Sequence, residues 1–88
     1  MFNNRRSEID IIGEILILSQ NGVRKTEILY QANLCYLQLK KYLSFLLEKN
    51  ILEEKVIRNN GNSFSVYQTT PKGNKLSIDI NKALSYFK

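Results

Sequence analysis

Several residue types that catalytic and metal sites commonly need are scarce in this sequence. It has no histidine and a single cysteine, Cys35, among its 88 residues. Histidine is the commonest general base and metal ligand, and one cysteine cannot build a zinc site. The four glycines form no phosphate-binding loop. The sequence therefore predicts a protein that is not an enzyme, with no catalytic residue, metal ion or cofactor.

Long apolar runs are also missing. No stretch of the sequence approaches the ~20 apolar residues that a membrane-spanning helix needs. The first residues, MFNNRRSEID, contain Glu8 and Asp10 where a signal peptide would be apolar. A lone cysteine agrees with a reducing compartment. We therefore expect one small cytoplasmic domain spanning residues 1–88, for which oligomerisation is a natural source of stability.

Positive charge is concentrated in two segments. The chain carries a formal charge of +5, to which residues 22–45 contribute +3 and residues 55–75 contribute +4. Acids gather in residues 1–21 and 46–54. Such segregation favours a polyanionic partner over a merely soluble basic protein.

Residues 25–52 predict two helices joined by a tight turn. The first runs from about residue 27 to 31 with Thr26 as its N-cap, and Asn33 fits the left-handed break after it. The second helix covers about residues 35–49. Its apolar face is expected to hold Tyr36, Leu39, Leu43, Leu46 and Leu47. A short helix, a turn and a longer helix with a basic face are typical of a helix-turn-helix, although a plain helical hairpin has the same pattern.

A helix is predicted before this pair, over about residues 6–20. Ser7 is its expected N-cap, and Asn21-Gly22 ends it. Val23-Arg24 leaves room for a single strand bridge. The apolar face of this helix is predicted to hold Ile9, Ile12 and Leu16, with Ile11 and Ile15 beside them.

A hairpin and a last helix are predicted after the pair. Asn50 is a plausible cap, strands cover about residues 52–57 and 63–69, and residues 59–62 form a turn. Thr70 then caps a helix that begins at Pro71 and continues to about residue 87. The fold class is α+β, mostly α: a winged helix-turn-helix of order α-β-α-α-β-β-α. Residues 7–69 are its DNA-binding core, residues 52–69 its wing, and residues 70–88 its C-terminal helix.

The sequence resembles the small archaeal winged-helix transcription regulators, and the dimeric archaeal DNA-binding proteins built on the same domain. The resemblance covers roughly residues 7 to 85 and rests on the stretches KTEILYQANLCYLQLKKYLSFLLEKNIL and YQTTPKGNKL. The matching residues are Thr26, Ile28, Tyr30, Asn33, Leu34, Tyr36, Tyr42, Leu43, Leu46, Tyr67, Thr70, Lys72 and Gly73. The resemblance implies binding of double-stranded DNA and an antiparallel dimer. Cys35 and Asn50 depart from it, standing where the family usually has Ser and Gly, and the last helix is shorter than in the chromatin-like relatives.

The expected DNA contacts come from three places. Gln38, Lys40, Lys41 and Ser44 lie on the polar face of the second helix of the pair. Glutamine pairs bidentately with adenine, and lysine reaches guanine or phosphate. The remaining predicted contacts are Arg24, Lys25, Tyr36, Arg58, Asn60, Asn62 and Lys72. The wing residues 58–63 are expected at the minor groove or backbone, whereas the spacing of Tyr36 suits the core better than a phosphate.

The last helix carries a stripe that is typical of a dimer seam. Leu76, Ile80, Ala83 and Phe87 are spaced 4, 3 and 4 residues apart, with Leu84 beside them. The alternative is that this helix folds back on its own core. The sequence predicts a homodimeric, nucleoid-associated, sequence-specific transcription regulator. A chromatin-type binder of low specificity and a winged helix used for protein contacts are the alternatives.

Overall fold

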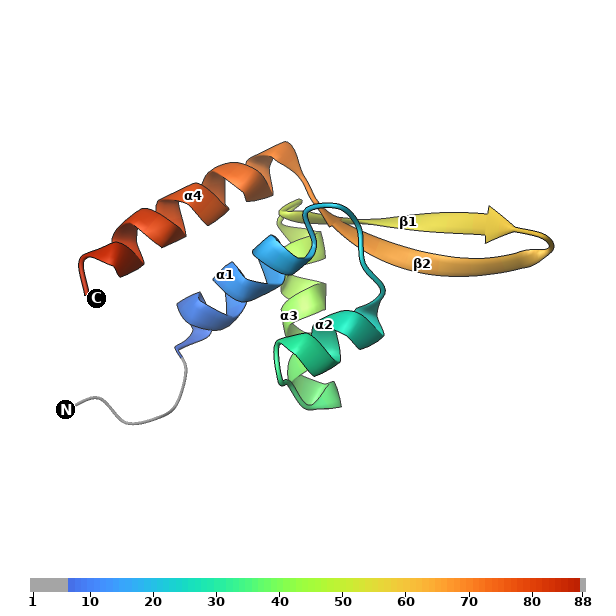
Figure 1. Ribbon diagram of the computed structural model, residues 1–88, viewed down its shortest axis with the longest axis horizontal. Helices are drawn as coiled ribbons and strands as arrows, with labels where there is room; N and C mark the ends of the chain where they lie inside the picture. Colours follow the sequence, from blue (N-terminus) through green and yellow to red (C-terminus); the bar gives the residue numbers. More distant parts are fainter. Residues whose placement is uncertain (1–6, 88) are drawn as a thin grey trace.

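The computed structural model describes residues 7–87, which form four helices and one β-hairpin (Figure 1). The elements are α1 (Glu8–Leu18), α2 (Lys25–Gln31), α3 (Tyr36–Glu48), β1 (Leu52–Asn59), β2 (Asn62–Thr69) and α4 (Pro71–Ser85). The hairpin of β1 and β2 follows α3 and projects from the helices as a wing. The predicted winged-helix fold and its order of elements are confirmed.

The first helix starts at its predicted cap. The Asp10 backbone N–H donates to Ser7 Oγ at 3.1 Å, and the Ser7 N–H donates to Asp10 Oδ2 at 3.4 Å. These two bonds satisfy two donors that the helix cannot pair internally. Arg6, expected inside this helix, lies outside the described residues. The buried face is also rotated from the prediction, because Ile11, Ile15 and Leu16 are buried while Ile9 is 47% exposed.

The turn between α2 and α3 is set by two residues with polar side chains. Asn33 has a φ of 55°, the left-handed conformation that the sequence predicted. The Gln38 side chain reaches back over the first turn of α3, where its Oε1 accepts the Cys35 backbone N–H at 3.0 Å. One local prediction is wrong, because Arg24, not Thr26, is the N-cap of α2. Cys35 is the N-cap of α3 and is exposed.

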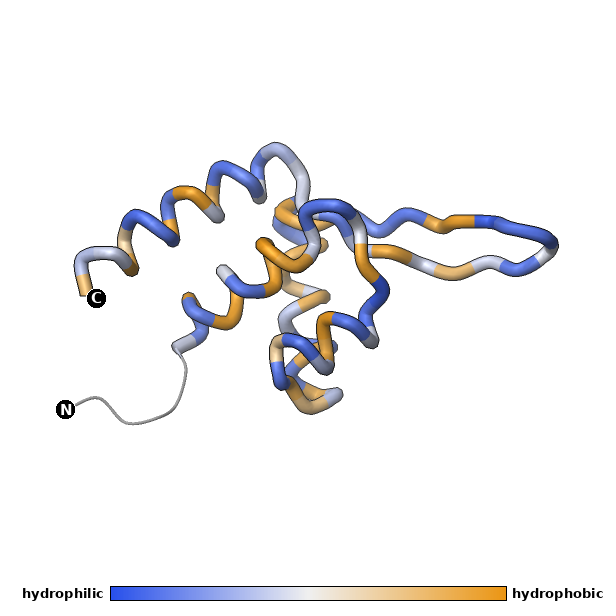
Figure 2. Tube along the Cα trace, in the orientation of Figure 1, coloured by the Kyte–Doolittle hydropathy of each residue, from blue (hydrophilic) through white to orange (hydrophobic). Residues whose placement is uncertain are grey.

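The wing is a two-stranded antiparallel ribbon with a two-residue turn. Its register pairs Leu52 with Thr69 at the base and Asn59 with Asn62 at the tip. Between them Asn60 and Gly61 have φ values of 53° and 81°, which is typical of the type I′ turn that Asn-Gly favours. Figure 2 shows that the tip is mostly hydrophilic. The turn predicted for residues 59–62 is confirmed.

Hydrogen bonds tie the base of the wing to α1 and to the connection between α1 and α2. Val23 and Tyr67 exchange two backbone hydrogen bonds, at 3.0 and 2.7 Å, which is the single bridge that the sequence predicted. The Thr69 hydroxyl donates to the Leu16 carbonyl at 2.8 Å. These bonds fix the direction of the wing relative to α1 and α2.

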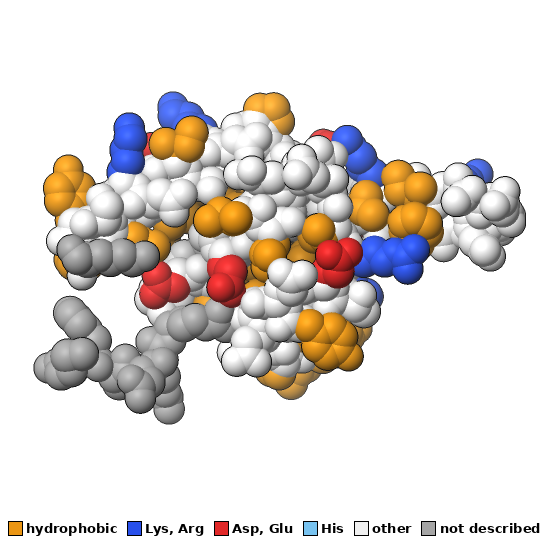
Figure 3. All heavy atoms as spheres, in the orientation of Figure 1, with side chains coloured by type: hydrophobic (Ala, Val, Ile, Leu, Met, Phe, Trp, Pro, Cys, Tyr) orange, Lys and Arg blue, Asp and Glu red, His pale blue; other side chains and the backbone are white. Residues whose placement is uncertain are grey.

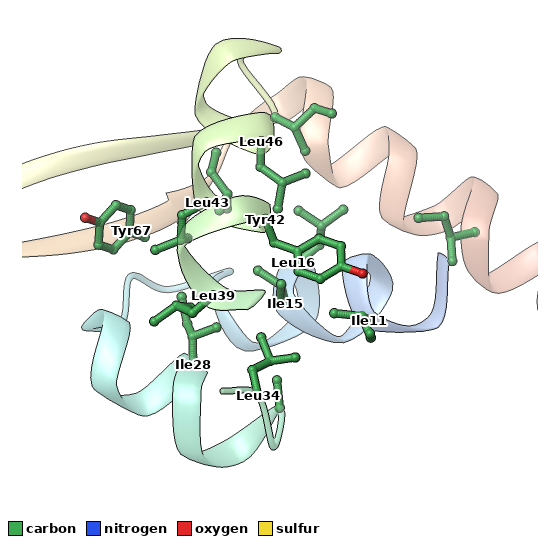
Figure 4. Packing of buried hydrophobic residues seen from close by; sticks show 14 residues of the cluster. Ile11, Ile15, Leu16, Ile28, Leu34, Leu39, Tyr42, Leu43, Leu46 and Tyr67 are labelled. Carbon is green, nitrogen blue, oxygen red and sulfur yellow. The ribbon is translucent and has the colours of Figure 1, made fainter. Parts of the chain in front are cut away.

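The core lies where α3 crosses α1 and α2 (Figure 4). Four residues of α3 enter it: Leu39, Tyr42, Leu43 and Leu46. The expectation that Tyr36 belongs to this face is wrong, since its side chain is 58% exposed. Tyr42 is buried instead, because α1 packs on the side of α3 that carries Tyr42 and leaves Tyr36 on the edge toward the wing.

The last helix packs on its own chain. Thr70 Oγ1 accepts the Gly73 N–H at 3.0 Å, and Pro71 occupies the first turn, as predicted. A side chain at Gly73 would collide with the Ile51 carbonyl, so glycine lets α4 start close to β1. Further along α4, Ile80 is buried against α1. A Cβ added to Gly13 of α1 would lie 3.1 Å from Ile80 Cγ2. The glycine at position 13 of α1 therefore lets α4 pack closely against the core.

This packing changes the interpretation of the predicted dimer seam. Ile80 is buried, while Leu76 and Leu84 are half-buried against the same core. Ile80 is therefore covered by its own chain, beside Gly13 of α1, whereas Leu76 and Leu84 keep part of their surface exposed. The far end of the stripe remains uncovered: Ala83 is exposed, and Phe87 is 80% exposed.

Candidate nucleic-acid interface

The outward face of α3 follows from its buried face. With about 3.6 residues per turn, the side opposite Leu39, Tyr42, Leu43 and Leu46 carries positions 37, 41, 44 and 48. Leu37, Lys41 and Ser44 are all exposed there, one turn apart in sequence. Lys41 and Ser44 were predicted contacts. Leu37, which the sequence analysis missed, is the first residue of this stripe and is 76% exposed.

Four of the predicted contacts line one hollow. A hollow of about 200 Å³ lies between the start of α2, α3 and the base of the wing. Its walls include Lys25, Tyr36, Lys40 and Ser44, with apolar residues of α3 and Tyr67 behind them. The Lys25 Nζ is 6.0 Å from the centre of the Tyr36 ring, at the limit of a cation–π contact. The fold thus gathers two lysines, a tyrosine and a serine from two elements into one surface.

A second hollow extends this surface toward the wing. It measures about 350 Å³ and is lined by residues of α2 and both strands, including Arg24, Lys25 and Ser65. Arg24 stacks on the wing, with its Cζ 3.8 Å from the centre of the Phe64 ring. We call the two hollows together the basic groove. Figure 3 shows blue side chains near the root of the wing, on one face of the molecule.

A buried tyrosine forms the floor of the basic groove. Tyr67 lines both hollows and is buried. Burial, together with the nearby Glu54 carboxylate, raises the pKa of Tyr67 above its usual 10.0. The phenol therefore stays protonated at neutral pH and carries no charge that would repel an anion.

The Gln38 side chain has a structural task. Bidentate pairing with adenine needs the amide oxygen as acceptor and the amide nitrogen as donor. The oxygen already accepts the Cys35 N–H. Gln38 is exposed at the edge of the outward stripe, so base contact would require it to share or release this cap.

The wing tip presents the predicted polar residues. Arg58, Asn60 and Asn62 are exposed. Arg58 and Asn62 line a shallow hollow of about 380 Å³ with Gly61 and Ser63. Lys55 lies nearer the base, where its Nζ donates to Gln68 Oε1 at 2.8 Å and forms an ion pair with Glu53 Oε1 at 3.2 Å. Arg58 is therefore the cation best placed at the tip.

Lys72 lies apart from the basic groove. Its Nζ donates to the Lys49 carbonyl at 2.9 Å, at the C-terminal end of α3. This end is about 20 Å from the helix start, at ~1.5 Å per residue. Lys72 thus caps the C-terminal end of α3, a position that the negative end of the helix dipole favours, and its DNA contact stays a prediction.

Residues 7–87 hold no cluster of three or more His, Cys, Asp or Glu side chains suited to a metal ion. Within the same residues no helix is long and apolar enough to cross a bilayer.

A third helix with an exposed basic face, followed by a β-hairpin, defines a winged helix-turn-helix domain. Residues 5–87 match the winged helix-turn-helix family, and the chain belongs to that family. No match was found among curated proteins.

Solved structures share the fold. Sso10a-2, a DNA-binding protein from Sulfolobus solfataricus, has a TM-score of 0.79 and 26% identity, over 92% of this chain and 81% of that one. The transcriptional regulator PcaV of Streptomyces coelicolor, solved with its natural ligand, has a TM-score of 0.75 and 13% identity, over 96% and 58%. ZitR of Lactococcus lactis, solved in complex with DNA, has a TM-score of 0.66 and 13% identity, over 97% and 60%. This chain spans less than two thirds of PcaV and of ZitR, and their likeness shows the fold alone.

Proposed function

We propose that this protein is a dimeric, sequence-specific transcription regulator that binds double-stranded DNA on the chromosome, in the cytoplasm. Helix α3 enters the major groove, and residues 58–63 of the wing contact the minor groove or the phosphate backbone. The protein performs no catalysis in this role.

The observation that carries the proposal is the basic groove beside α3. Lys25, Tyr36, Lys40 and Ser44 line one of its hollows, and Arg24 lines the other. Lysine and arginine contact phosphates, and hydroxyl groups also donate to phosphate oxygens. The outward stripe of α3 lies next to these groups, so backbone contacts at the groove would hold that stripe against base edges.

The dimer is supported by the end of α4. Tyr86 and Phe87 are adjacent aromatic residues, and their side chains are 85% and 80% exposed. A second copy that covers them would remove a large apolar area from water. Ala83 completes the uncovered part of the stripe.

A binder of low specificity is the second function that an observation favours. The Gln38 oxygen is occupied by the helix cap, which leaves α3 with fewer free groups that distinguish base pairs. In that case the lysines would hold any duplex alike, and sequence preference would be small.

Selection of bound sequences from a random duplex pool tests the proposal. A regulator should enrich one motif, and a dimer should enrich two half-sites related by two-fold symmetry. The Lys40→Ala, Lys41→Ala double variant should recover much less DNA than the wild type. The Lys75→Ala, Lys82→Ala double variant removes the same charge from exposed positions of α4 and is the matched control.

The outcomes separate the alternatives. Duplexes recovered without an enriched motif would establish the low-specificity binder. Failure to recover duplex DNA at low salt would overturn the proposal. An equal loss in both double variants would show that net charge, not the basic groove, holds the DNA.

A further inference from the structure

The inference concerns Leu37 and rests on the function proposed above. Leu37 lies in the first turns of α3, and 76% of its side chain is exposed. It is the first residue of the outward stripe, one turn before Lys41 and two turns before Ser44. A large apolar side chain therefore stands where a recognition helix would meet base edges.

Leu37 contributes nothing to the packing of the domain. The core-facing residues of α3 are on the opposite side of the helix, and Leu37 is absent from the residues packed around them. A single exposed leucine is common on protein surfaces and needs no explanation by itself. The charged groups around Leu37 indicate which kind of partner it contacts.

The surrounding charges indicate a polyanion rather than an apolar protein surface. Lys41 follows Leu37 on the stripe, and Lys40 borders it on the side of the basic groove. Glu48 occupies the last position of the stripe and would repel phosphates there. DNA would therefore meet the N-terminal half of α3, which is the half that carries Leu37.

The major groove offers one apolar group to such a side chain. Thymine displays its C5-methyl group there, whereas the other bases present donors and acceptors. We propose that Leu37 is a specificity-determining residue that contacts a thymine methyl group and so favours A·T pairs at its position. Lys41 and the groove residues would hold the helix in place, while Leu37 would distinguish the base.

Removing the methyl group tests this contact directly. The duplex is the one selected from the random pool, or an alternating adenine–thymine duplex if the pool yields no motif. A second duplex has the same sequence with every thymine replaced by deoxyuridine, which lacks only the methyl group. Burial of one methyl group is typically worth a factor of about four in affinity, so the wild type should bind the thymine duplex about fourfold more tightly.

Three variants test whether the preference for the thymine duplex depends on Leu37. Leu37→Ala should bind both duplexes equally, and it should remain folded because position 37 is exposed. Lys41→Ala should bind both more weakly while keeping their ratio. Tyr30→Ala, which removes an equally exposed apolar side chain from α2, should also keep the ratio.

The inference is overturned if the wild type binds the two duplexes equally, or if Leu37→Ala keeps the wild-type ratio. Either result would leave the proposed function intact, because salt-sensitive duplex binding would persist. Absence of binding to both duplexes would instead overturn the proposed function and this inference with it.

Discussion

The guanidinium of Arg24 stacks on the ring of Phe64, 3.8 Å from its centre, and so joins the start of α2 to the second strand of the wing. The stack holds a cation at the edge of the basic groove and limits the freedom of both side chains. Contacts of this kind are worth ~0.5–1 kcal/mol at exposed sites.

Loss of this stack should weaken DNA binding without removing a charge. Phe64→Leu keeps a half-buried apolar residue in the wing but frees Arg24, so we expect a few-fold loss of affinity and a similar salt dependence. Ile57, which pairs with Phe64 across the wing, provides the conservative control Ile57→Leu. If Phe64→Leu binds like the wild type while Arg24→Ala binds weakly, the charge matters and the stack does not.

The two tasks of Gln38 can be separated by substitution. Gln38→Ala should relax base preference at one position by about 1–3 kcal/mol if the amide contacts a base edge. Gln38→Glu retains an acceptor for the Cys35 N–H, so it should preserve the thermal stability that Gln38→Ala loses. An unchanged selected motif in Gln38→Ala would show that Gln38 only caps the helix.

Lys72 should affect stability rather than DNA binding. Lys72→Ala removes the bond to the Lys49 carbonyl. Hydrogen bonds that involve a charged group contribute roughly 1.5–3 kcal/mol to stability, and an exposed bond such as this one contributes less. Chemical denaturation measures this loss, and duplex affinity should stay near that of the wild type. A loss of affinity comparable to that of Lys41→Ala would place Lys72 in the interface after all.

Substitutions at two positions of the same stripe of α4 should have different effects. Ile80→Asp puts a charge into the core beside Gly13 and should unfold the domain. Phe87→Asp changes an exposed residue, so it should leave the circular dichroism spectrum unchanged but give monomers and weaken DNA binding. Burial of large apolar side chains at about 1.5–3 kcal/mol each makes such a contact strong enough to matter. Sedimentation of the wild type as a monomer at tens of micromolar would contradict the dimer.

Local backbone chemistry was readable from the sequence because it depends on few residues. Asn33, Asn50 and Asn60 all adopt positive φ, and Thr70 with Pro71 starts α4 where expected. Asparagine tolerates the left-handed region, and a capping hydroxyl acts within three residues. These residues locate the turns, and the turns mark where each helix and strand begins and ends.

The direction of each helix face was only partly readable: Leu39, Leu43 and Leu46 are buried as predicted, but the edges of each face depend on how the helices dock. The spacing of apolar residues predicted Tyr36 in the core, but α1 packs on the side of α3 that carries Tyr42. Ile80 was likewise expected at a dimer seam, but Gly13 gives α4 a closer partner within the chain. Leu37 was missed since an exposed leucine stands out only once the opposite face of α3 is known.

The salt dependence of duplex binding tests most directly the claim that the basic groove and the adjacent outward stripe of α3 hold DNA. We expect the logarithm of the association constant to fall linearly with the logarithm of salt concentration, with a slope of about −0.9 for each phosphate contacted. The Lys40→Ala, Lys41→Ala variant should have a slope shallower by about 1 for each lysine that contacts a phosphate, while Lys75→Ala, Lys82→Ala should keep the wild-type slope. An affinity that stays flat from low to moderate salt, or the same slope in all three proteins, would contradict the account.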